Sequence, residues 1–359
     1  MTRIPALSPA RLEPTFVPRI WGVKSLAPLF PEKQGLQELI GEVWLTGSES
    51  RFATGPFAGR SLADAWGAMP PEWAGTQINT REPFPILAKF LFPGEKLSVQ
   101  VHPDDEYARK HESAASAVGK TEAWYIVSAE PGASVYVGLR AGVTRENFRR
   151  AIAEETVEDC LAKVPVAKGE AVFVPARTAH TIGPGLVICE VQENSDLTYR
   201  VYDYGRRYPD GSTRPLHIEK ALEVINFAEQ RGGKLHPAVA HAHGGTIEHF
   251  VACRYFALEK WDFASSVSLT TERTHFELWI ILNGRGKIRW ESAERSGPGT
   301  ADFAPGEVWF VPAALDRWKI DPEAQACILH VYKPDLGLYA EQLSRYGLPA
   351  AEVAQVIHT

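Results

Sequence analysis

Two stretches of this chain resemble each other, and this internal repeat limits the folds that the sequence can adopt. KGEAVFVPARTAHTI starts at Lys168 and PGEVWFVPAALDRWKI starts at Pro305, with Gly-Glu and Val-Pro-Ala in matching places. A weaker pair, TEAWYIV and FELWIIL, aligns Glu122 with Glu277. Along the chain, TEAWYIV and KGEAVFVPARTAHTI of the first copy are farther apart than FELWIIL and PGEVWFVPAALDRWKI of the second. The first copy therefore carries an insertion. Such self-similarity predicts two copies of one folding unit.

The repeated unit consists of short strands. KLSVQVH alternates apolar and polar residues, and EAVFVP and GLVICEVQE are short apolar runs rich in β-branched residues. These runs are separated by many of the 29 glycines and 26 prolines in the chain. Many short strands broken by turn residues are typical of β-sandwiches and barrels. We therefore predict a mainly β protein with two related β-barrels, the first of which carries helices.

Helical patterns interrupt the first copy. An insertion over about 141–163 has Thr144 as a plausible N-cap, and it accounts for the extra length of this copy. Asp104 and Asp105 suit the first turn of another helix, where negative charge is favourable. A connecting helix is predicted over 217–230.

A Gly pair at 232–233 and the polar run that follows indicate a boundary. We predict an N-terminal barrel domain over 1–232 and a C-terminal barrel domain over 233–359 that ends in a helix.

Composition excludes several classes of protein. The formal net charge of −6 offers no basic excess for nucleic-acid binding. Neither a signal peptide nor an apolar run long enough to span a membrane is found, so a soluble, cytoplasmic protein without a membrane partner is expected. The four cysteines form no C-x-x-C motif, so a zinc knuckle and a redox pair are not indicated.

Four side chains of the first copy are candidate metal ligands. Gln100 and His102 are two residues apart on a predicted strand, so both point to the same face. Glu122 shares a face with Trp124, where a carboxylate is costly to bury unless it is paired or metal-bound. His180 follows a turn after the strand EAVFV. This mixture of nitrogen and oxygen donors suits zinc, and also iron, manganese or cobalt.

The second copy does not repeat this set. The alignment places Arg317 where the first copy has His180, and only Glu277 is retained. If these residues served the fold, both barrels would need them. Their presence in one copy predicts a site in the N-terminal barrel and a C-terminal barrel without metal ligands. His236, His241 and His243 lie in a Gly- and Ala-rich segment that is expected to be a solvated loop.

Four longer motifs carry a family resemblance. QVHPDD, GKTEAWYIV, PARTAHTIG and ENSDLTYRVYDYGR together resemble the type I phosphomannose isomerases, in their short bacterial form. The resemblance implies two cupin-like jelly-roll barrels and one zinc ion per chain, with a phosphorylated sugar as substrate. It implies that zinc is bound by Gln100, His102, Glu122 and His180, and that Arg200 is catalytic.

The implied reaction interconverts mannose 6-phosphate and fructose 6-phosphate through an enediol or enediolate. A cation near the oxygens lowers the barrier to proton removal from the neighbouring carbon. Arg200 can stabilise the developing charge or bind phosphate, and Lys120 is a second cation that can donate or accept a proton. Lys120, Glu122 and a zinc-bound hydroxide all remain open as the base.

Other assignments stay open at this stage. Lys89, Arg206 and Arg207 are candidates for phosphate contact, or simply face solvent. The alternatives for function are another metal-dependent cupin enzyme, such as an iron dioxygenase, and a sugar-binding protein without activity. The preferred sugar, the native metal and the oligomeric state are not predicted.

Overall fold

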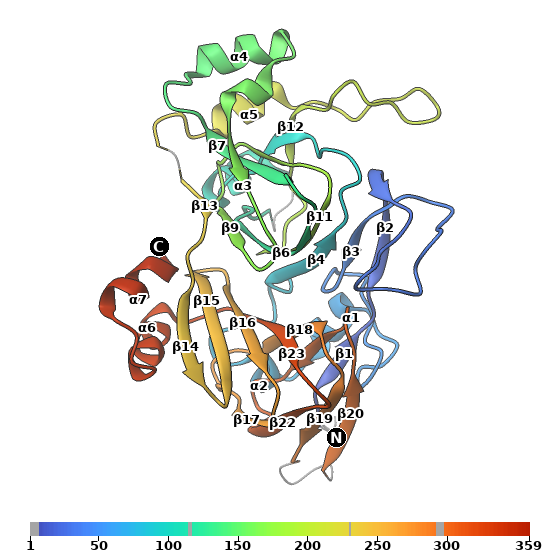
Figure 1. Ribbon diagram of the computed structural model, residues 1–359, viewed down its shortest axis with the longest axis vertical. Coiled ribbons are helices and arrows are strands. Elements are labelled where there is room, and N and C mark those ends of the chain that lie inside the picture. Colours follow the sequence, from blue (N-terminus) through green and yellow to red (C-terminus); the bar gives the residue numbers. More distant parts are fainter. Residues whose placement is uncertain (1–6, 114–116, 230, 292–297) are drawn as a thin grey trace.

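The computed structural model describes residues 7–113, 117–229, 231–291 and 298–359, and it consists of two stacked β-sandwiches (Figure 1). Four sheets account for the strands, and helices lie at the ends and sides, so the predicted mainly β class is confirmed. Within the described ranges, no helix combines the length and the apolar character that crossing a membrane requires.

The first sandwich holds the candidate ligands. Its larger sheet has the order β13-β9-β6-β11-β4-β3-β2 and its smaller sheet the order β12-β5-β10-β7-β8. The larger sheet contains β2 (Thr15–Val23), β3 (Ile40–Trp44), β4 (Ile86–Leu91), β6 (Glu122–Ala129), β9 (Ala171–Val174), β11 (Leu186–Glu193) and β13 (Gly233–Lys234). The smaller sheet contains β5 (Val99–Val101), β7 (Ser134–Leu139), β8 (Leu161–Pro165), β10 (His180–Ile182) and β12 (Tyr199–Tyr202).

The second sandwich is built mainly from the last third of the chain. Its larger sheet has the order β1-β21-β18-β23-β16-β15-β14, with β24 paired to β15, and its smaller sheet the order β17-β22-β19-β20. The larger sheet contains β1 (Ala10–Leu12), β14 (Ala238–Ala242), β15 (Gly245–Cys253), β16 (Ala257–Phe263), β18 (Glu277–Asn283), β21 (Val308–Val311), β23 (Ala326–Tyr332) and β24 (Ile357–His358). The smaller sheet contains β17 (Val267–Thr270), β19 (Gly286–Trp290), β20 (Gly299–Phe303) and β22 (Arg317–Pro322).

The strand β1 comes from the opposite end of the sequence and pairs with β21, so that Ala10 lies opposite Phe310. The boundary at 232/233 stays a prediction, because segments on each side of it contribute to both sandwiches.

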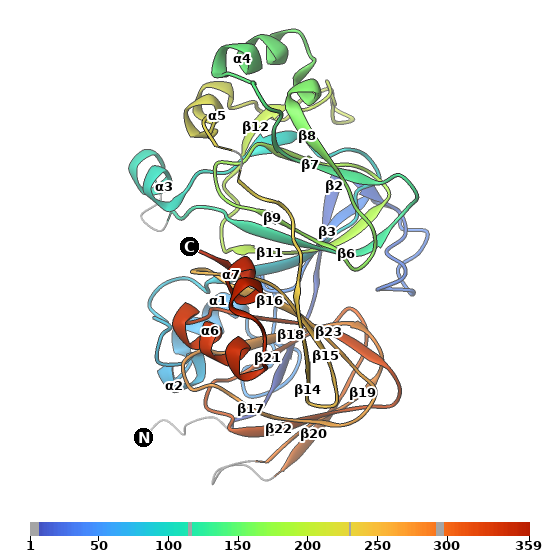
Figure 2. The same cartoon turned by 60° about the vertical axis from the view of Figure 1, so that its left-hand side comes forward.

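The two larger sheets pack against each other in the middle of the molecule (Figure 2). Tyr125 of β6 meets Phe250 of β15 with ring centroids 5.7 Å apart. Phe90 and Leu258 belong to the same apolar cluster. This contact explains why β4 and β11 are buried along their whole length: one face packs on the second sandwich and the other faces the interior of the first.

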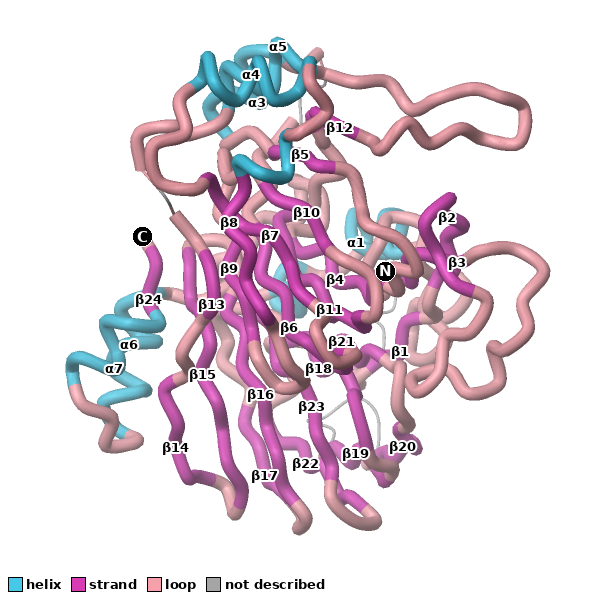
Figure 3. The backbone as a smooth tube through the Cα atoms, turned by 45° about the horizontal axis from the view of Figure 1, so that its top comes forward, coloured by secondary structure: helices cyan, strands magenta, loops and turns pink. Residues whose placement is uncertain are grey.

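The helices are α1 (Leu62–Ala68), α2 (Pro71–Ala74), α3 (Asp105–His111), α4 (Arg145–Ala153), the 3-10 helix η1 (Val157–Cys160), α5 (Ile218–Val224), α6 (Leu336–Arg345) and α7 (Ala350–Val356). Three of them, α3, α4 and α5, gather at the far end of the first sandwich (Figure 3). The predicted C-terminal helix is present as two short helices, α6 and α7, beside the second sandwich.

Two helical predictions were too long. The insertion begins as predicted, with the Thr144 hydroxyl accepting from the Asn147 amide, but residues 161–163 already belong to β8. The connecting helix ends at Val224. The Asn226 side chain accepts from the amides of Ala228 and Glu229, and this local capping competes with helix continuation.

All four cysteines are free thiols, and Cys327 alone among them is not fully buried.

Candidate metal centre

Strand register brings three of the predicted site residues side by side. On the smaller sheet of the first sandwich, Gln100 of β5 is paired with His180 of β10 on one side and with Arg200 of β12 on the other. Residues paired in this way have side chains on the same face of a sheet. His102 follows directly after β5, and Glu122 begins β6 on the opposite sheet. The candidate ligands therefore come from both sheets and meet between them.

The donor atoms converge closely. One donor atom from each of His102, Glu122 and His180 lies within 4.8 Å of the others, and these three side chains are buried. The Glu122 carboxylate has one oxygen 3.4 Å from Nε2 of His102 and the other 3.6 Å from Nε2 of His180. The Gln100 amide lies 3.2 Å from Nε2 of His180. In the described part of the chain, this is the one group of three or more His, Cys, Asp or Glu residues with such geometry.

Both histidines are oriented as metal ligands are. Nδ1 of His102 lies 2.7 Å from the Leu197 carbonyl, and Nδ1 of His180 lies 2.8 Å from the Thr178 carbonyl. A carbonyl accepts from Nδ1–H, which leaves Nε2 free of a proton and directed at the centre. Burial lowers the pKa of His102 to about 3 and also lowers that of His180, so both rings are neutral. The second oxygen of Glu122 has no hydrogen-bond partner. The residues therefore fit a divalent cation.

A line of alternating charges leads to this centre. Its five members, in spatial order, are Glu42, Lys89, Glu190, Lys120 and Glu122. The Lys89 ammonium lies 3.0 Å from Glu190, and the Lys120 ammonium contacts Glu122 and lies 3.2 Å from Nε2 of His102.

The pKa values in this line follow from burial and neighbouring charge. Burial and the charge of Glu122 raise the pKa of Glu190. Burial also acts to raise the pKa of Glu42, but Lys89 and Arg19 outweigh it and lower that pKa to about 2.

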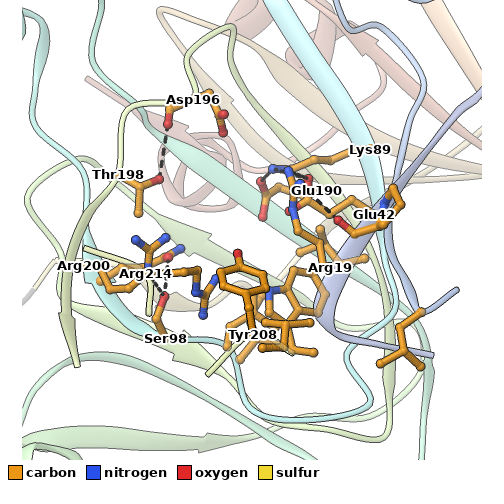
Figure 4. A pocket seen from close by; sticks show the side chains of 18 of the residues that line it. Arg19, Glu42, Lys89, Ser98, Glu190, Asp196, Thr198, Arg200, Tyr208 and Arg214 are labelled. Carbon is orange, nitrogen blue, oxygen red and sulfur yellow. Dashed lines mark hydrogen bonds and ion pairs between the residues drawn. The ribbon is translucent and has the colours of Figure 1, made fainter. Parts of the chain in front are cut away.

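The centre adjoins a cavity of about 800 Å³: Gln100, which contacts His180, and Lys120, which contacts Glu122, are among the residues that line it, whereas the His102, Glu122 and His180 side chains are not. Gln100, Lys120 and Glu190 line its inner part, and the mouth carries arginines and a tyrosine: Arg19, Arg200, Arg214 and Tyr208 (Figure 4). Arg200 is held by the Ser98 hydroxyl and the Pro215 carbonyl, each at 3.2 Å. A volume of this size suits a small ligand such as a sugar phosphate.

Comparison with known proteins gives the family. Residues 246–331 match the family model described as mannose-6-phosphate isomerase, cupin domain. The mannose-6-phosphate isomerase ManA of Bacillus subtilis is 32% identical over 340 residues, which cover 90% of this chain and 99% of that protein. The chain belongs to the mannose-6-phosphate isomerase family. The probable mannose-6-phosphate isomerase GmuF of Bacillus subtilis is 35% identical and covers 78% of the chain and 87% of its own length.

The fold agrees with this mannose-6-phosphate isomerase membership. The crystal structure of the mannose 6-phosphate isomerase from Bacillus subtilis superposes with a TM-score of 0.80 at 30% identity, covering 90% of this chain and 99% of that one. The family resemblance predicted from the motifs is confirmed, and the comparisons favour it over an oxygenase or an inactive sugar-binding protein.

The part of the chain that matches the cupin model of the mannose-6-phosphate isomerases lies in the second sandwich. The buried residues between the two sheets of this sandwich vary those of the first sandwich. Three positions paired across adjacent strands correspond between the two sandwiches. In the first they are Lys89, Glu190 and Trp124, and in the second Glu259, His330 and Trp279. The buried ion pair is thus kept with its polarity reversed.

The alignment predicted that Arg317 is the counterpart of His180, but side-chain packing shows that the counterpart is Trp318. Trp124 packs edge-on against His180 at 5.5 Å, and Trp279 packs in the same way against Trp318 at 5.1 Å. His180 is six residues after Val174, whereas Trp318 is seven residues after Val311, so Arg317 comes one position before the packed ring and lies exposed. An indole therefore fills the space where the first sandwich of this mannose-6-phosphate isomerase family member has an imidazole.

The sequence did not indicate some residues of the site, and it suggested phosphate contact for others that do not line the cavity. Glu190 was not singled out, although a carboxylate inside the apolar run LVICEVQE is a signal of a buried polar centre. Arg214 was also missed, because no pattern in its loop indicates a cavity. Lys89 lines the cavity, whereas Arg206 and Arg207 are absent from its lining and bind the Asp203 carboxylate and the Gly211 carbonyl, respectively.

Substitution of His330 by glutamine tests the ionic core of the second sandwich. Nδ1 of His330 lies 3.0 Å from Glu259 and Nε2 lies 3.4 Å from Glu277. Burial alone would lower the pKa of His330, but these carboxylates raise it from 6.5 to about 9. The folded pKa exceeds the unfolded one, so the stabilisation is complete below about pH 6.5 and is lost as the pH rises through about 9.

We therefore expect His330→Gln to lower the free energy of unfolding most at pH 6 and progressively less up to pH 10. The pKa difference corresponds to on the order of 3 kcal/mol. Denaturant unfolding of both proteins across this range measures the effect, with His241→Gln on the exposed part of β14 as control. A difference that did not change with pH would contradict a charged His330.

Proposed function

We propose that this protein interconverts mannose 6-phosphate and fructose 6-phosphate with one bound zinc ion. The observation that carries the proposal is the convergence of Gln100, His102, Glu122 and His180 next to a cavity that Gln100 and Lys120 line. Two imidazoles, one carboxylate and one amide are a donor set that zinc accepts. When bound, the cation supplies a positive charge that polarises the substrate carbonyl and stabilises negative charge on oxygen.

The proposed reaction moves protons without a net change of oxidation state. A proton leaves C2 of the open-chain sugar and one is returned to C1, while the O2 hydroxyl proton is lost and O1 gains a proton. The carbonyl thereby moves from C1 to C2. The chain has to carry these protons and to stabilise the negative charge of the enediolate that forms between the two steps.

Two cations flank the proposed path. Lys120 is buried, yet its ammonium reaches the cavity between Glu122 and Glu190, so it can exchange a proton with the substrate there. Arg200 lies beside Gln100 through strand pairing and is permanently charged, so it stabilises the enediolate without taking up its proton. Their contacts with neighbouring carboxylates, hydroxyls and carbonyls hold both side chains in position before substrate binds.

The phosphate is proposed to bind at the mouth. Arg214 and Tyr208 line this part of the cavity and are proposed to bind the phosphate (Figure 4), whereas Arg200 is assigned to the enediolate. The Asp203 carboxylate binds the Arg214 guanidinium and orients it. Lys89 is less suited to phosphate, because Glu190 and Glu42 already neutralise it. An oxyanion at the mouth places the reacting end of a six-carbon chain toward Lys120.

Turnover with mannose 6-phosphate tests the proposal. Protein loaded with zinc is expected to form fructose 6-phosphate, and unphosphorylated mannose is expected to react at least about 100-fold less efficiently, because Arg214 and Tyr208 at the mouth would have no oxyanion to bind. Removal of the metal by a chelator should abolish the reaction, and zinc should restore it. Absence of conversion by protein with one zinc ion confirmed per chain would contradict the proposal.

A further inference from the structure

The second sandwich reaches the candidate active site of the first through one turn. Arg254 and Tyr255 connect β15 to β16, and both contact the first helical residue of α3. The Arg254 guanidinium lies 3.0 Å from Oδ2 of Asp105, and the Tyr255 hydroxyl donates to the same oxygen, also at 3.0 Å. The Asp105 side chain is 16% exposed and that of Arg254 is 63% exposed, so solvent competes less for the partly buried Tyr255 bond than for the Arg254 bond.

The other oxygen of Asp105 is bound to the segment that carries Lys120. Its Oδ1 accepts from the Gly119 amide at 2.8 Å, one residue before Lys120. A side chain at position 119 would meet the backbone of α3, since an added Cβ would lie 2.7 Å from the Asp105 amide nitrogen. The Lys120 amide donates to the Pro103 carbonyl at 3.1 Å. This short segment is thus fixed against the start of α3.

The segment ends at the candidate metal ligands. Thr121 donates its amide to Glu193 at 2.7 Å, and Glu122 follows it. The Lys120 ammonium then contacts Glu122 and reaches His102. A series of polar contacts therefore runs from the β15–β16 turn through Asp105 to the Gly119 amide, and the next residue of the chain, Lys120, carries the ammonium group.

We propose that the second sandwich positions Lys120: Arg254 and Tyr255 hold Asp105, and Asp105 holds the Gly119 amide and with it the backbone of Lys120. Asp105, Arg254 and Tyr255 are positioning residues that do not touch the substrate. The role assigned to Lys120 rests on the proposed isomerase function. A sandwich without the metal ligand set thereby contributes to the geometry of the reaction centre in the other.

Two variants break the series at different points. Asp105→Ala removes both of its contacts, and Arg254→Ala combined with Tyr255→Phe removes only the support from the second sandwich and leaves α3 unchanged. Misplacement of a catalytic group by about 1 Å lowers turnover by up to about 100-fold. We expect kcat to fall about tenfold in Asp105→Ala and about threefold or more in the double variant, with KM within about twofold of the wild-type value.

Controls separate positioning from general stability. The single variant Arg254→Lys, with Tyr255 unchanged, should keep most of the wild-type turnover because it keeps a cation beside Asp105. Arg109→Ala, which removes another cation 4.0 Å from the same carboxylate but within α3 itself, should leave kcat unchanged. Zinc content should be one per chain in every variant. Assays well below the unfolding temperature ensure that a lower kcat reflects geometry rather than unfolded protein.

Hydrogen exchange of the Gly119 amide gives a readout that does not depend on activity. Faster exchange at Gly119 in both variants, with lower kcat and unchanged KM, would support the proposal. Wild-type exchange together with wild-type kcat would overturn it. If the zinc-loaded wild-type protein does not convert mannose 6-phosphate, the proposed function fails, and the exchange rate at Gly119 alone then decides whether the second sandwich holds this segment.

Discussion

His180→Ala is expected to lower both zinc content and turnover by at least about 100-fold. His180 is 1% exposed, and its ring is fixed by the Thr178 carbonyl and faces Glu122. Alanine leaves no donor on this strand, and the buried Glu122 carboxylate then loses part of its compensation. Elemental analysis of the purified variant and assay of fructose 6-phosphate formation measure the two losses.

His102→Ala should give the same double loss, because His102 is the second proposed imidazole ligand and its Nε2 lies 3.4 Å from the other oxygen of Glu122. The matched control is His241→Ala, which removes an exposed histidine in the second sandwich and should keep one zinc ion per chain. Chelation offers a further comparison: it should lower the unfolding temperature of the wild-type protein and leave that of the ligand variants unchanged. Full zinc occupancy in either ligand variant would show that the ion binds elsewhere.

Arg200→Ala is expected to keep zinc and to lower kcat/KM by about 1000-fold, since it removes a permanent charge from the proposed reaction centre. Arg200 contributes none of the four proposed ligands, although it is paired with Gln100 on the neighbouring strand. Arg200→Lys should recover only part of the loss. A lysine keeps the charge but cannot bind the Ser98 hydroxyl and the Pro215 carbonyl with one planar group.

The control for Arg200 is Arg207→Ala, in the loop between β12 and α5. Arg207 binds the Gly211 carbonyl and does not line the cavity, so its removal changes the net charge equally without changing the site. Zinc analysis and steady-state kinetics on both variants give the result. Normal turnover by Arg200→Ala would remove this arginine from the mechanism, and loss of zinc would assign it a structural role instead.

The fold class was predictable because it depends on local pattern. Alternation in KLSVQVH placed Gln100 and His102 on one face, and the internal repeat indicated two related units. The approach of His180 to Gln100, and of Arg200 to the other side, depends on strand register between segments far apart in the chain, which local pattern does not encode. Here the family resemblance supplied what the pattern could not.

The errors also have physical causes. The connecting helix was extended past Val224 because helix propensity continues there, whereas capping by Asn226 ends it. Arg317 was aligned with His180 because an ungapped comparison of the two segments matches them by position, whereas packing against Trp279 identifies Trp318, one residue later, as the counterpart. Glu190 was overlooked because the cations that compensate its buried charge, Lys89 and Lys120, lie on other strands and become its neighbours only in the folded chain.

The pairing of β1 with β21 has a consequence for synthesis of the protein. The ribosome makes Ala10 among the first residues, but its partner Phe310 emerges only when most of the polypeptide has been translated. Until then β1 has backbone contacts with residues 51–53 but not the sheet neighbour that makes it part of the second sandwich. Assembly of the two halves is therefore expected to be completed late and together, and fragments cut between them should be prone to aggregation at the uncovered edge.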